Sequence, residues 1–303
     1  MSITMAAVLT ACGHRASNSS VDGDSLAVDS TIVEAAALPT IQTDSVGMVQ
    51  EDSMANVTIS ADWPTGGDEK LVAAIRQHIW KELDAATVSE EKQMGVKYSD
   101  EGKDVVKSAV TKHYGELSNM WKDMRADGLP WDMPFYFYAR IWKYNEGEGY
   151  ITYMTNTEGF TGGAHGYATS TAVTFSKASG EKIGYDNVYD PKREKFVTYN
   201  QTLFKDTTSP KLYQLIKKGL RKCMADENGK QPSDEELNDM LQVDDINRVP
   251  LPQYAPCFTE KGLCFTYQQY EIACYAVGII SFNIPYDEIL PFLTSEAAAL
   301  VVK

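Results

Sequence analysis

The chain is short of basic residues, and this shortage limits what it can bind. Its 303 residues include 28 Lys and Arg against 42 Asp and Glu, which gives a formal net charge of −14. A surface of this charge repels the phosphate backbone, so we expect no nucleic-acid partner. A basic partner would be attracted instead.

Long hydrophobic runs are also missing. No stretch approaches the ~20 consecutive apolar residues that a membrane-spanning helix needs, so we expect no integral membrane segment. Hydrophobic residues still make up 43% of the chain, which is enough to form a core. At about 150 residues per domain, the length allows about two domains.

Common catalytic signatures are absent as well. The sequence contains no H-E-x-x-H, no G-x-S-x-G, no phosphate-binding loop and no dinucleotide fingerprint. It has no C-x-x-C or C-x-x-H spacing that would indicate a metal site. We therefore predict no metal and no cofactor, and we favour a protein that is not an enzyme.

The N-terminus has the pattern of a targeting signal. An apolar run over residues 3–11 ends in L-T-A before Cys12, and small residues at this place form a bacterial lipobox. We predict a lipoprotein signal at residues 1–12, with Cys12 lipidated. A signal peptide should carry Lys or Arg before the apolar run. None is present here, which leaves open a start upstream of Met1.

Residues 13–52 are predicted to be a disordered acidic tether. Between residues 16 and 52 there are seven acidic residues, no Lys or Arg, and no persistent helical or strand period. Such a segment is solvated and repels itself. A lipidated Cys followed by this spacer predicts attachment to a membrane through a lipid anchor only, in the bacterial cell envelope (periplasm or outer membrane).

The folded part is expected to begin with a strand and two helices. Residues 55–63 alternate between apolar and polar, and Asp68 can cap a helix whose apolar residues recur at 3.6-residue spacing. A second helix is predicted over residues 100–125. We interpret His113 on its apolar stripe, and His78 on the first helix, as core histidines rather than ligands.

The remaining pattern predicts an α+β fold, with an antiparallel sheet meander and helices packed on one side. Three strands are expected at residues 134–144, 150–156 and 167–176. Helical segments are expected near residues 191–204, 209–225 and 233–241, followed by a hairpin at 254–268, a strand at 277–284 and a short helix from 285. Two associated subdomains, residues 53–180 and 181–303, are predicted.

The strand at residues 134–144 has two faces of different chemistry. Its apolar face consists of Phe135, Phe137, Ala139 and Ile141. Its other face consists of Tyr136, Tyr138, Arg140, Trp142 and Tyr144. Aromatic rings with polar tips are typical of sugar platforms and of protein hot spots. A sheet covered on both sides, with the Tyr hydroxyls satisfied internally, would explain the pattern equally well.

A glycine-rich loop surrounds His165, the one candidate catalytic residue. Gly162, Gly163 and Gly166 permit φ > 0 and a close backbone approach, which can place an imidazole in a cleft. A general base at His165 would need a partner, and the candidates are Glu158, Glu271 and Tyr275. We favour the simpler interpretation, in which the glycines build a tight strand connection and the imidazole bonds to the backbone.

Four cysteines remain besides Cys12. Cys257 and Cys264 flank a predicted turn and would lie opposite each other in a hairpin. A disulfide between them would leave Cys223 to pair with Cys274. Free buried thiols are an equally good interpretation.

Three segments together resemble a known pair of extracytoplasmic domains. They are F-T-G-G-A-H-G at Phe160–Gly166, the strand-turn-strand at Thr174–Ile183, and Leu263–Tyr286 with Y-E-I-A-C-Y-A-V-G at Tyr270–Gly278. They look like the pair shared by RsiV-type anti-sigma factors and the non-catalytic part of PdaC-type peptidoglycan deacetylases, which Bacteroidetes lipoproteins also resemble. The resemblance covers about residues 54–295, with 53–180 PdaC-like and 181–303 RsiV-like.

This resemblance implies recognition rather than catalysis. The RsiV relatives bind lysozyme, and the deacetylase relatives keep catalysis in a separate domain for which these residues leave no room. We expect a monomeric, non-catalytic binding module for a cell-envelope glycan or a basic protein such as lysozyme. The alternative is a hydrolase of envelope glycans or peptides that uses His165 with a nearby carboxylate. The candidate ligand-binding residues are Tyr136, Tyr138, Trp142, Tyr144, Gly162, Gly163, His165, Tyr270 and Tyr275.

Overall fold

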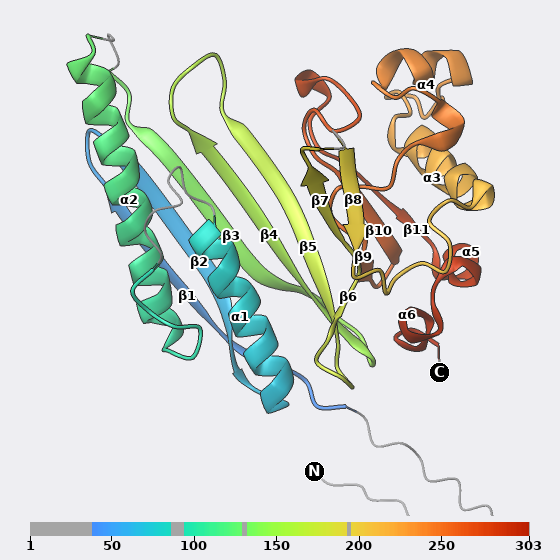
Figure 1. Ribbon diagram of the computed structural model, residues 1–303, viewed down its shortest axis with the longest axis horizontal. Coiled ribbons are helices and arrows are strands. Elements are labelled where there is room, and N and C mark those ends of the chain that lie inside the picture. Colours follow the sequence, from blue (N-terminus) through green and yellow to red (C-terminus); the bar gives the residue numbers. More distant parts are fainter. Residues whose placement is uncertain (1–37, 86–93, 129–131, 193–194, 303) are drawn as a thin grey trace, which may run out of the picture. The chain divides into compact units, whose positions relative to one another are not determined.

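The computed structural model describes residues 38–85, 94–128, 132–192 and 195–302 (Figure 1). The predicted signal, Cys12 and the tether up to residue 37 lie outside these residues. Residues 37–303 form one compact unit. Within the described residues, no helix combines the length and apolarity that crossing a membrane requires.

The largest sheet has six strands in the order β1 to β6, and its two connecting helices explain one parallel pair. The strands are β1 (Gln42–Glu51), β2 (Ala55–Gly66), β3 (Phe135–Glu146), β4 (Tyr150–Phe160), β5 (Tyr167–Ser176) and β6 (Lys182–Ile183). Neighbours are antiparallel except β2 and β3. A parallel pair needs a long crossover, which α1 (Glu69–Ala85) and α2 (Gly102–Ala126) supply. The predicted α+β fold is confirmed; the parallel pair was not foreseen.

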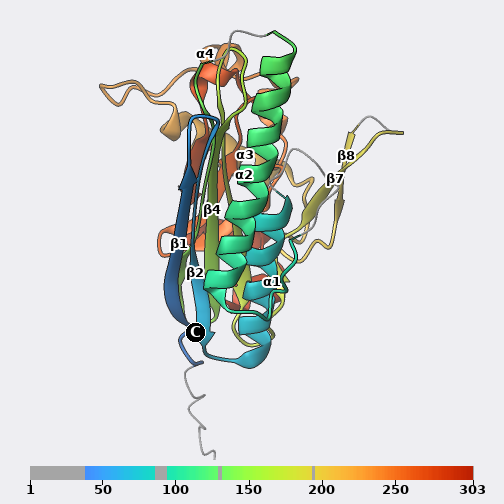
Figure 2. The same ribbon diagram turned by 90° about the vertical axis from the view of Figure 1, so that its left-hand side faces the viewer.

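Both crossover helices lie on one face of this sheet (Figure 2). Asp68 caps α1, because its Oδ1 accepts the backbone N–H of Leu71 at 3.0 Å. His113 of α2 is buried, with Nε2 3.0 Å from the Leu83 carbonyl oxygen and its ring stacked on Phe137 at 4.4 Å. The interpretation of His113 as a core histidine is confirmed.

Strand β1 corrects the prediction of a disordered tether up to residue 52. Its register pairs Val46 with Ala61 and Met48 with Ile59, so both apolar side chains join the core under the helices. Most other residues of β1 are exposed, because this strand forms the edge of the sheet. Pairing with β2 therefore orders a segment that has too few apolar residues to show a strand period on its own.

A second sheet has three antiparallel strands in the order β11-β10-β9. These strands are β9 (Cys257–Thr259), β10 (Gly262–Tyr267) and β11 (Ile280–Ile284). The helices of this part of the chain are α3 (Pro210–Cys223), α4 (Asp234–Met240), α5 (Tyr286–Ile289) and α6 (Ser295–Ala299). Short 3-10 turns lie at Ile246–Arg248, Tyr275–Val277 and Leu290–Phe292. The helices expected near 209–225 and 233–241 and the hairpin at 254–268 are confirmed.

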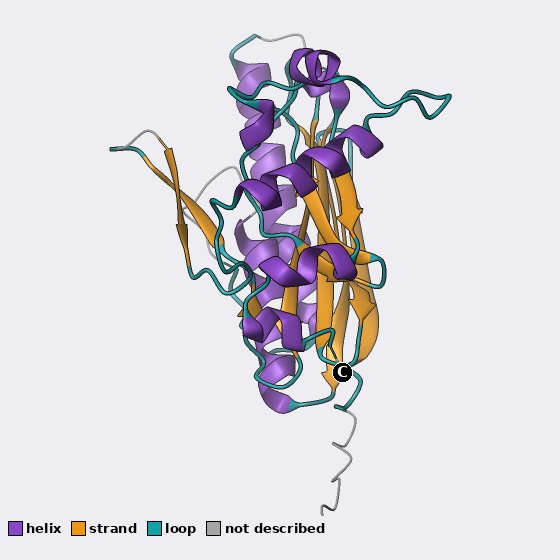
Figure 3. Ribbon diagram, turned by 90° about the vertical axis from the view of Figure 1, so that its right-hand side faces the viewer, coloured by secondary structure: helices purple, strands orange, loops and turns teal. Residues whose placement is uncertain are grey.

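The prediction of a helix near residues 191–204 is wrong. This region contributes to a hairpin of β7 (Asp186–Asp190) and β8 (Lys195–Tyr199), which stands away from the larger sheet (Figures 2 and 3). The run F-V-T-Y that ends β8 consists of residues that favour strands over helices. Val188, Tyr189, Phe196 and Tyr199 are each more than half exposed, between 51% and 54%.

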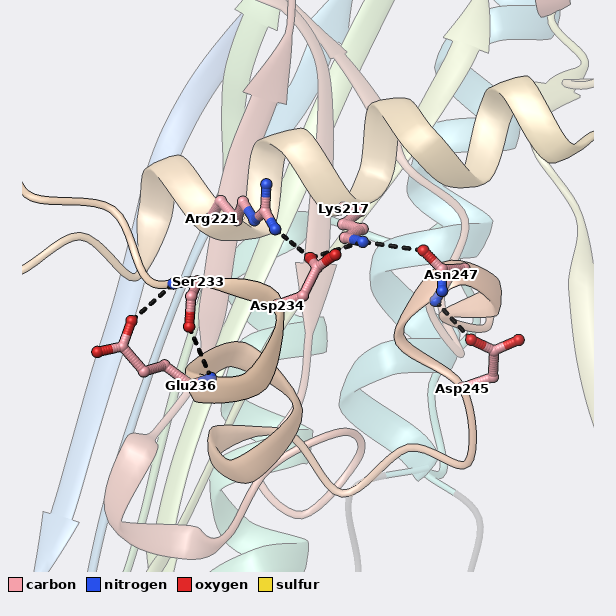
Figure 4. Close-up of polar contacts among 7 residues, drawn as sticks. All are labelled: Lys217, Arg221, Ser233, Asp234, Glu236, Asp245 and Asn247. Atoms are coloured by element: carbon pink, nitrogen blue, oxygen red, sulfur yellow. Dashed lines mark hydrogen bonds and ion pairs between the residues drawn. The ribbon is translucent and has the colours of Figure 1, made fainter.

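A polar cluster holds α3 to α4 and to the 3-10 turn that begins at Ile246 (Figure 4). The buried Lys217 Nζ donates to Asp234 Oδ1 at 2.6 Å and to Asn247 Oδ1 at 2.8 Å. Asp234 opens α4 beside a capping box formed by Ser233 and Glu236. Because the buried ammonium is paired and hydrogen-bonded, we assign this cluster a structural role.

The described residues form two hydrophobic clusters that meet at β4 and β5. One comprises residues between 41 and 175, and the other residues between 183 and 300 together with Tyr150. At the join, the Thr152 hydroxyl donates to the Phe258 carbonyl at 2.7 Å, and the Phe258 N–H donates to Thr174 Oγ1 at 3.1 Å. The subdomain boundary at residue 180 stays a prediction, because the two clusters share one compact unit.

Candidate binding surface

The face of the six-stranded sheet opposite α1 and α2 carries the predicted aromatic row. Residues Phe135, Phe137, Ala139 and Ile141 are all buried toward the helices, as predicted. The intervening residues reach solvent, with Tyr138 37% and Tyr144 43% exposed. This exposure favours an accessible surface over a sheet that is covered on both sides.

We call this surface the open face. It is defined by Tyr136, Tyr138, Arg140 and Trp142 of β3, with their register partners Asn56, Thr58 and Ser60 of β2 and Asn156 and Glu158 of β4. Aromatic side chains therefore lie in the middle, with amide and hydroxyl groups on the β2 side. On the β4 side, Asn156 and Glu158 lie between the apolar Met154 and Phe160. Three strands and the seven residues of β3 from Tyr136 to Trp142 span about 14 Å by 20 Å. This is roughly 300 Å², over a third of the ~800 Å² that one partner buries in a standard protein interface.

The side chains of the open face hold one another in place. The rings of Tyr136 and Tyr138 stack at 4.9 Å. The Arg140 guanidinium lies over the Trp142 ring at 4.8 Å, and Trp142 meets Tyr144 edge-on at 6.4 Å. Side chains that are ordered before binding lose less entropy when a partner docks.

Tyr144 is displaced by a β-bulge. The register between β3 and β4 shifts between Lys143 and Asn145, so Tyr144 is the extra residue. Its ring still contacts Trp142. Tyr144 therefore extends the aromatic row despite the break in the alternation.

The glycine-rich loop brings several predicted residues together beside Tyr136. Gly162 and Gly163 adopt φ of 98° and 92°, as predicted. A Cβ on Gly166 would lie 3.2 Å from the Tyr136 hydroxyl, so the loop adjoins the open face. The exposed His165 ring stacks on Tyr275 at 3.9 Å.

Both ring nitrogens of His165 have partners that are not carboxylates. Nδ1 lies 2.8 Å from the Gly166 carbonyl oxygen, and Nε2 lies 3.3 Å from the Tyr270 hydroxyl. Because a carbonyl oxygen can only accept, Nδ1 donates to Gly166. Tyr270 is 60% exposed and holds a left-handed φ of 64°. This arrangement matches the interpretation in which the imidazole bonds to the backbone.

The two acids that the sequence offers as partners of His165, Glu158 and Glu271, do not hydrogen-bond to its ring but have other neighbours. The Glu271 carboxylate accepts the backbone N–H groups of Gln253 at 2.5 Å and Gln268 at 2.7 Å, and burial raises its pKa. Glu271 therefore braces two loop segments. Glu158 lies on the open face, in register with Tyr138. Among the residues that the structure describes, no carboxylate pairs with the His165 imidazole, as the hydrolase alternative would require.

The four described cysteines are free thiols. Cys257 and Cys264 are buried and directly opposite each other in the β9–β10 hairpin, as predicted. The hydrogen bond between them raises the pKa of Cys257 and lowers that of Cys264. Cys223 and Cys274 are exposed, and the Cys223 thiol donates to the Ser281 carbonyl at 3.4 Å.

A concave site that the sequence does not predict lies on the helix side of the sheet. A cleft of about 460 Å³ is formed by α1, β5, residues 180–187 and residues 253–255. His78, which we interpret from the sequence as a core histidine, is half-buried and lies on the wall of this cleft. No local signal could have found the site, because its walls come from four separate parts of the chain.

The comparisons with known proteins agree with this architecture. A family model described as "Protein of unknown function (DUF3298)" matches residues 201–287, a region that contains α3, α4 and β9 to β11. A DUF3298 family member from Bacteroides fragilis NCTC 9343 is similar in structure, with a TM-score of 0.59 and 16% identity over 88% of this chain and 100% of that one. A DUF3298 family protein from Pseudomonas aeruginosa PAO1 gives a TM-score of 0.50 and 12% identity over 86% and 96% of the chains. No curated protein matches. At these identities the likeness shows the fold alone.

Proposed function

We propose that the chain is a non-catalytic, extracytoplasmic binding module that recognises a basic protein such as a lysozyme through the open face. The ordered row of Tyr138, Arg140 and Trp142, in which the first two are exposed and Trp142 is half-buried, is the observation that carries this proposal. Tyr, Trp and Arg are the residues that most often dominate binding energy at protein interfaces. A broad sheet face also suits a protein partner better than a small molecule, which prefers a concave site.

The charge of the chain supports a basic partner. The net charge is −14, and the exposed Glu158 adds a carboxylate within the open face itself. Opposite charges steer encounter and raise the association rate, and salt screens this effect. Close packing on the aromatic row would supply affinity that survives physiological salt.

The resemblance to RsiV-type and PdaC-type domains supports the same proposal. The RsiV relatives bind lysozyme outside the cytoplasm, and the DUF3298 match covers part of the RsiV-like half. A lipidated Cys12 would hold the module in the cell envelope. This location would place the open face where extracellular lysozymes act.

The test is a titration of the 303-residue chain with a c-type lysozyme at about 20 and 150 mM salt. We expect binding at both, with Trp142→Ala weakening the affinity at least about tenfold at the higher salt. The matched control is Tyr189→Ala, which removes an exposed ring from the β7–β8 hairpin and should leave affinity unchanged. No binding, binding that vanishes at 150 mM salt, or equal losses in both variants would reject the proposal.

A cell-envelope glycan is the second candidate for the same face. The stacked pair of Tyr136 and Tyr138, with Asn156 and Glu158 nearby, offers rings for sugar faces and polar groups for hydroxyls. Soluble peptidoglycan fragments would then bind with little dependence on salt, and Tyr138→Ala would weaken that binding. If fragments bind in this way and lysozyme does not, the glycan replaces the basic protein as the partner.

A further inference from the structure

The cleft on the helix side of the sheet has the form of a small-molecule site. Its volume is about 460 Å³, within the range of ligand pockets. Figure 1 shows α1 to one side of β5 and β7 to the other. The cleft lies between these elements, and residues 253–255 complete its lining.

The floor of the cleft is apolar and one aromatic ring stands at its rim. Val173, Phe175 and Tyr185 are each at most 6% exposed. Tyr254 is 42% exposed, so its ring is accessible from solvent. A ligand with one apolar face could lie against this ring.

His78 is one of the residues that line the cleft. Its Nε2 is buried and has no hydrogen-bond partner among the described residues. The ring meets Phe175 edge-on at 5.9 Å, and Nδ1 lies 3.7 Å from Glu82 Oε1. Burial lowers the pKa of His78 to about 3, so the imidazole is neutral near pH 7. A buried polar atom that stays unpaired is costly, and a bound hydroxyl would satisfy it.

The charges that line the cleft nearly cancel. Lys182 pairs with Asp186 at 2.5 Å, and Glu181 pairs with Lys70 at 2.9 Å. Lys81 and Glu82 then contribute one charge of each sign. The lining therefore gives no net attraction to an anion or a cation, and it suits a neutral polar ligand.

We propose that this cleft binds a neutral polyhydroxylated ligand of one or two sugar rings. The apolar face of a ring lies against Tyr254, and hydroxyl groups bond to His78 Nε2 and to Glu82. This site is on the side of the sheet away from the open face. It is therefore independent of the protein partner proposed above, and either proposal can fail without the other.

The test is saturation-transfer NMR of the 303-residue chain with two neutral disaccharides, cellobiose and N,N′-diacetylchitobiose. We expect transfer to at least one of them, and affinities at least about tenfold weaker in Tyr254→Ala and in His78→Phe. The Phe ring keeps the contact with Phe175 but has no Nε2. The matched control is Tyr98→Ala, which removes a tyrosine of similar exposure (41%) from outside both the cleft and the open face and should bind as the parent does.

Two outcomes would overturn the proposal. One is the absence of transfer to both disaccharides; the other is undiminished transfer in Tyr254→Ala and in a folded His78→Phe. Circular dichroism establishes whether each variant is folded. If His78→Phe does not fold, Glu82→Ala takes its place and should weaken binding in the same way, because Glu82 lines the cleft with a side chain that is 35% exposed and is the other proposed hydroxyl partner.

Discussion

The two faces of the six-stranded sheet are built from alternate residues of the same strands, yet they have different surroundings. On β3, Phe135 and Phe137 are buried under α1 and α2, whereas Tyr138 and Arg140 reach solvent one residue away. The difference comes from the crossover between β2 and β3, which places both helices on one side. Adjacent positions of one strand can therefore be changed to affect stability or recognition separately.

The largest expected effect tests this separation directly. Phe137 is 3% exposed and stacks on His113, so Phe137→Ala opens a cavity in the core. We expect the free energy of unfolding to fall by about 3–5 kcal/mol. Tyr138→Ala, the neighbouring position on the open face, should lower it by less than about 1 kcal/mol. Urea denaturation of the two variants measures both values, and similar losses would show that the faces are not distinct.

Sequence periodicity predicted β3 well because its two faces differ in chemistry along the whole strand. It failed for β1, where only Val46 and Met48 reach the core and pairing with β2 supplies the order. It failed again for residues 191–204, whose exposed aromatics lie on a hairpin rather than a helix. In both places the structure depends on partners that the local pattern does not contain.

The candidate sites show the same limit. Glycines predicted the left-handed turns at Gly162 and Gly163, because few other residues adopt that φ. The stacking of His165 on Tyr275 joins segments more than a hundred residues apart, which no local motif could place. The cleft beside His78 is harder still, since its walls come from four parts of the chain.

A smaller expected effect is the pH dependence of the free energy of unfolding, which we attribute to histidines on the covered face of the sheet. Burial lowers the pKa of His113 from 6.5 to about 4 and that of His78 to about 3. At a pH between the two pKa values of each histidine, the unfolded chain therefore binds more protons than the folded chain does. The free energy of unfolding therefore falls as the pH drops below about 6.5, by about 2 kcal/mol per histidine at pH 5.

Histidine variants assign this pH dependence to the covered face. His113→Gln removes one buried titrating ring, so the loss between pH 7 and pH 5 should shrink by about 2 kcal/mol. His165→Gln changes an exposed histidine beside the open face and should leave the loss unchanged. Urea denaturation at both pH values measures it. An unchanged slope in His113→Gln would mean that carboxylates, not the buried rings, control acid stability.

The smallest expected effect concerns charge on the open face. Glu158 is exposed there, so Glu158→Gln should change the free energy of unfolding by less than about 0.5 kcal/mol. Its carboxylate is nevertheless placed to steer a basic partner. Lysozyme association at about 20 mM salt should slow roughly two- to threefold, and the difference should disappear at 150 mM.

A matched variant separates local steering from total charge. Glu181→Gln removes the same charge, but from the helix side, where Glu181 lines the cleft and pairs with Lys70. If the open face is the docking surface, this variant should associate nearly as fast as the parent in stopped-flow measurements. Equal slowing in both variants would mean that only the net charge attracts lysozyme. That result would count against the aromatic row as the docking site for lysozyme, because the order of its rings alone does not show that a partner binds there.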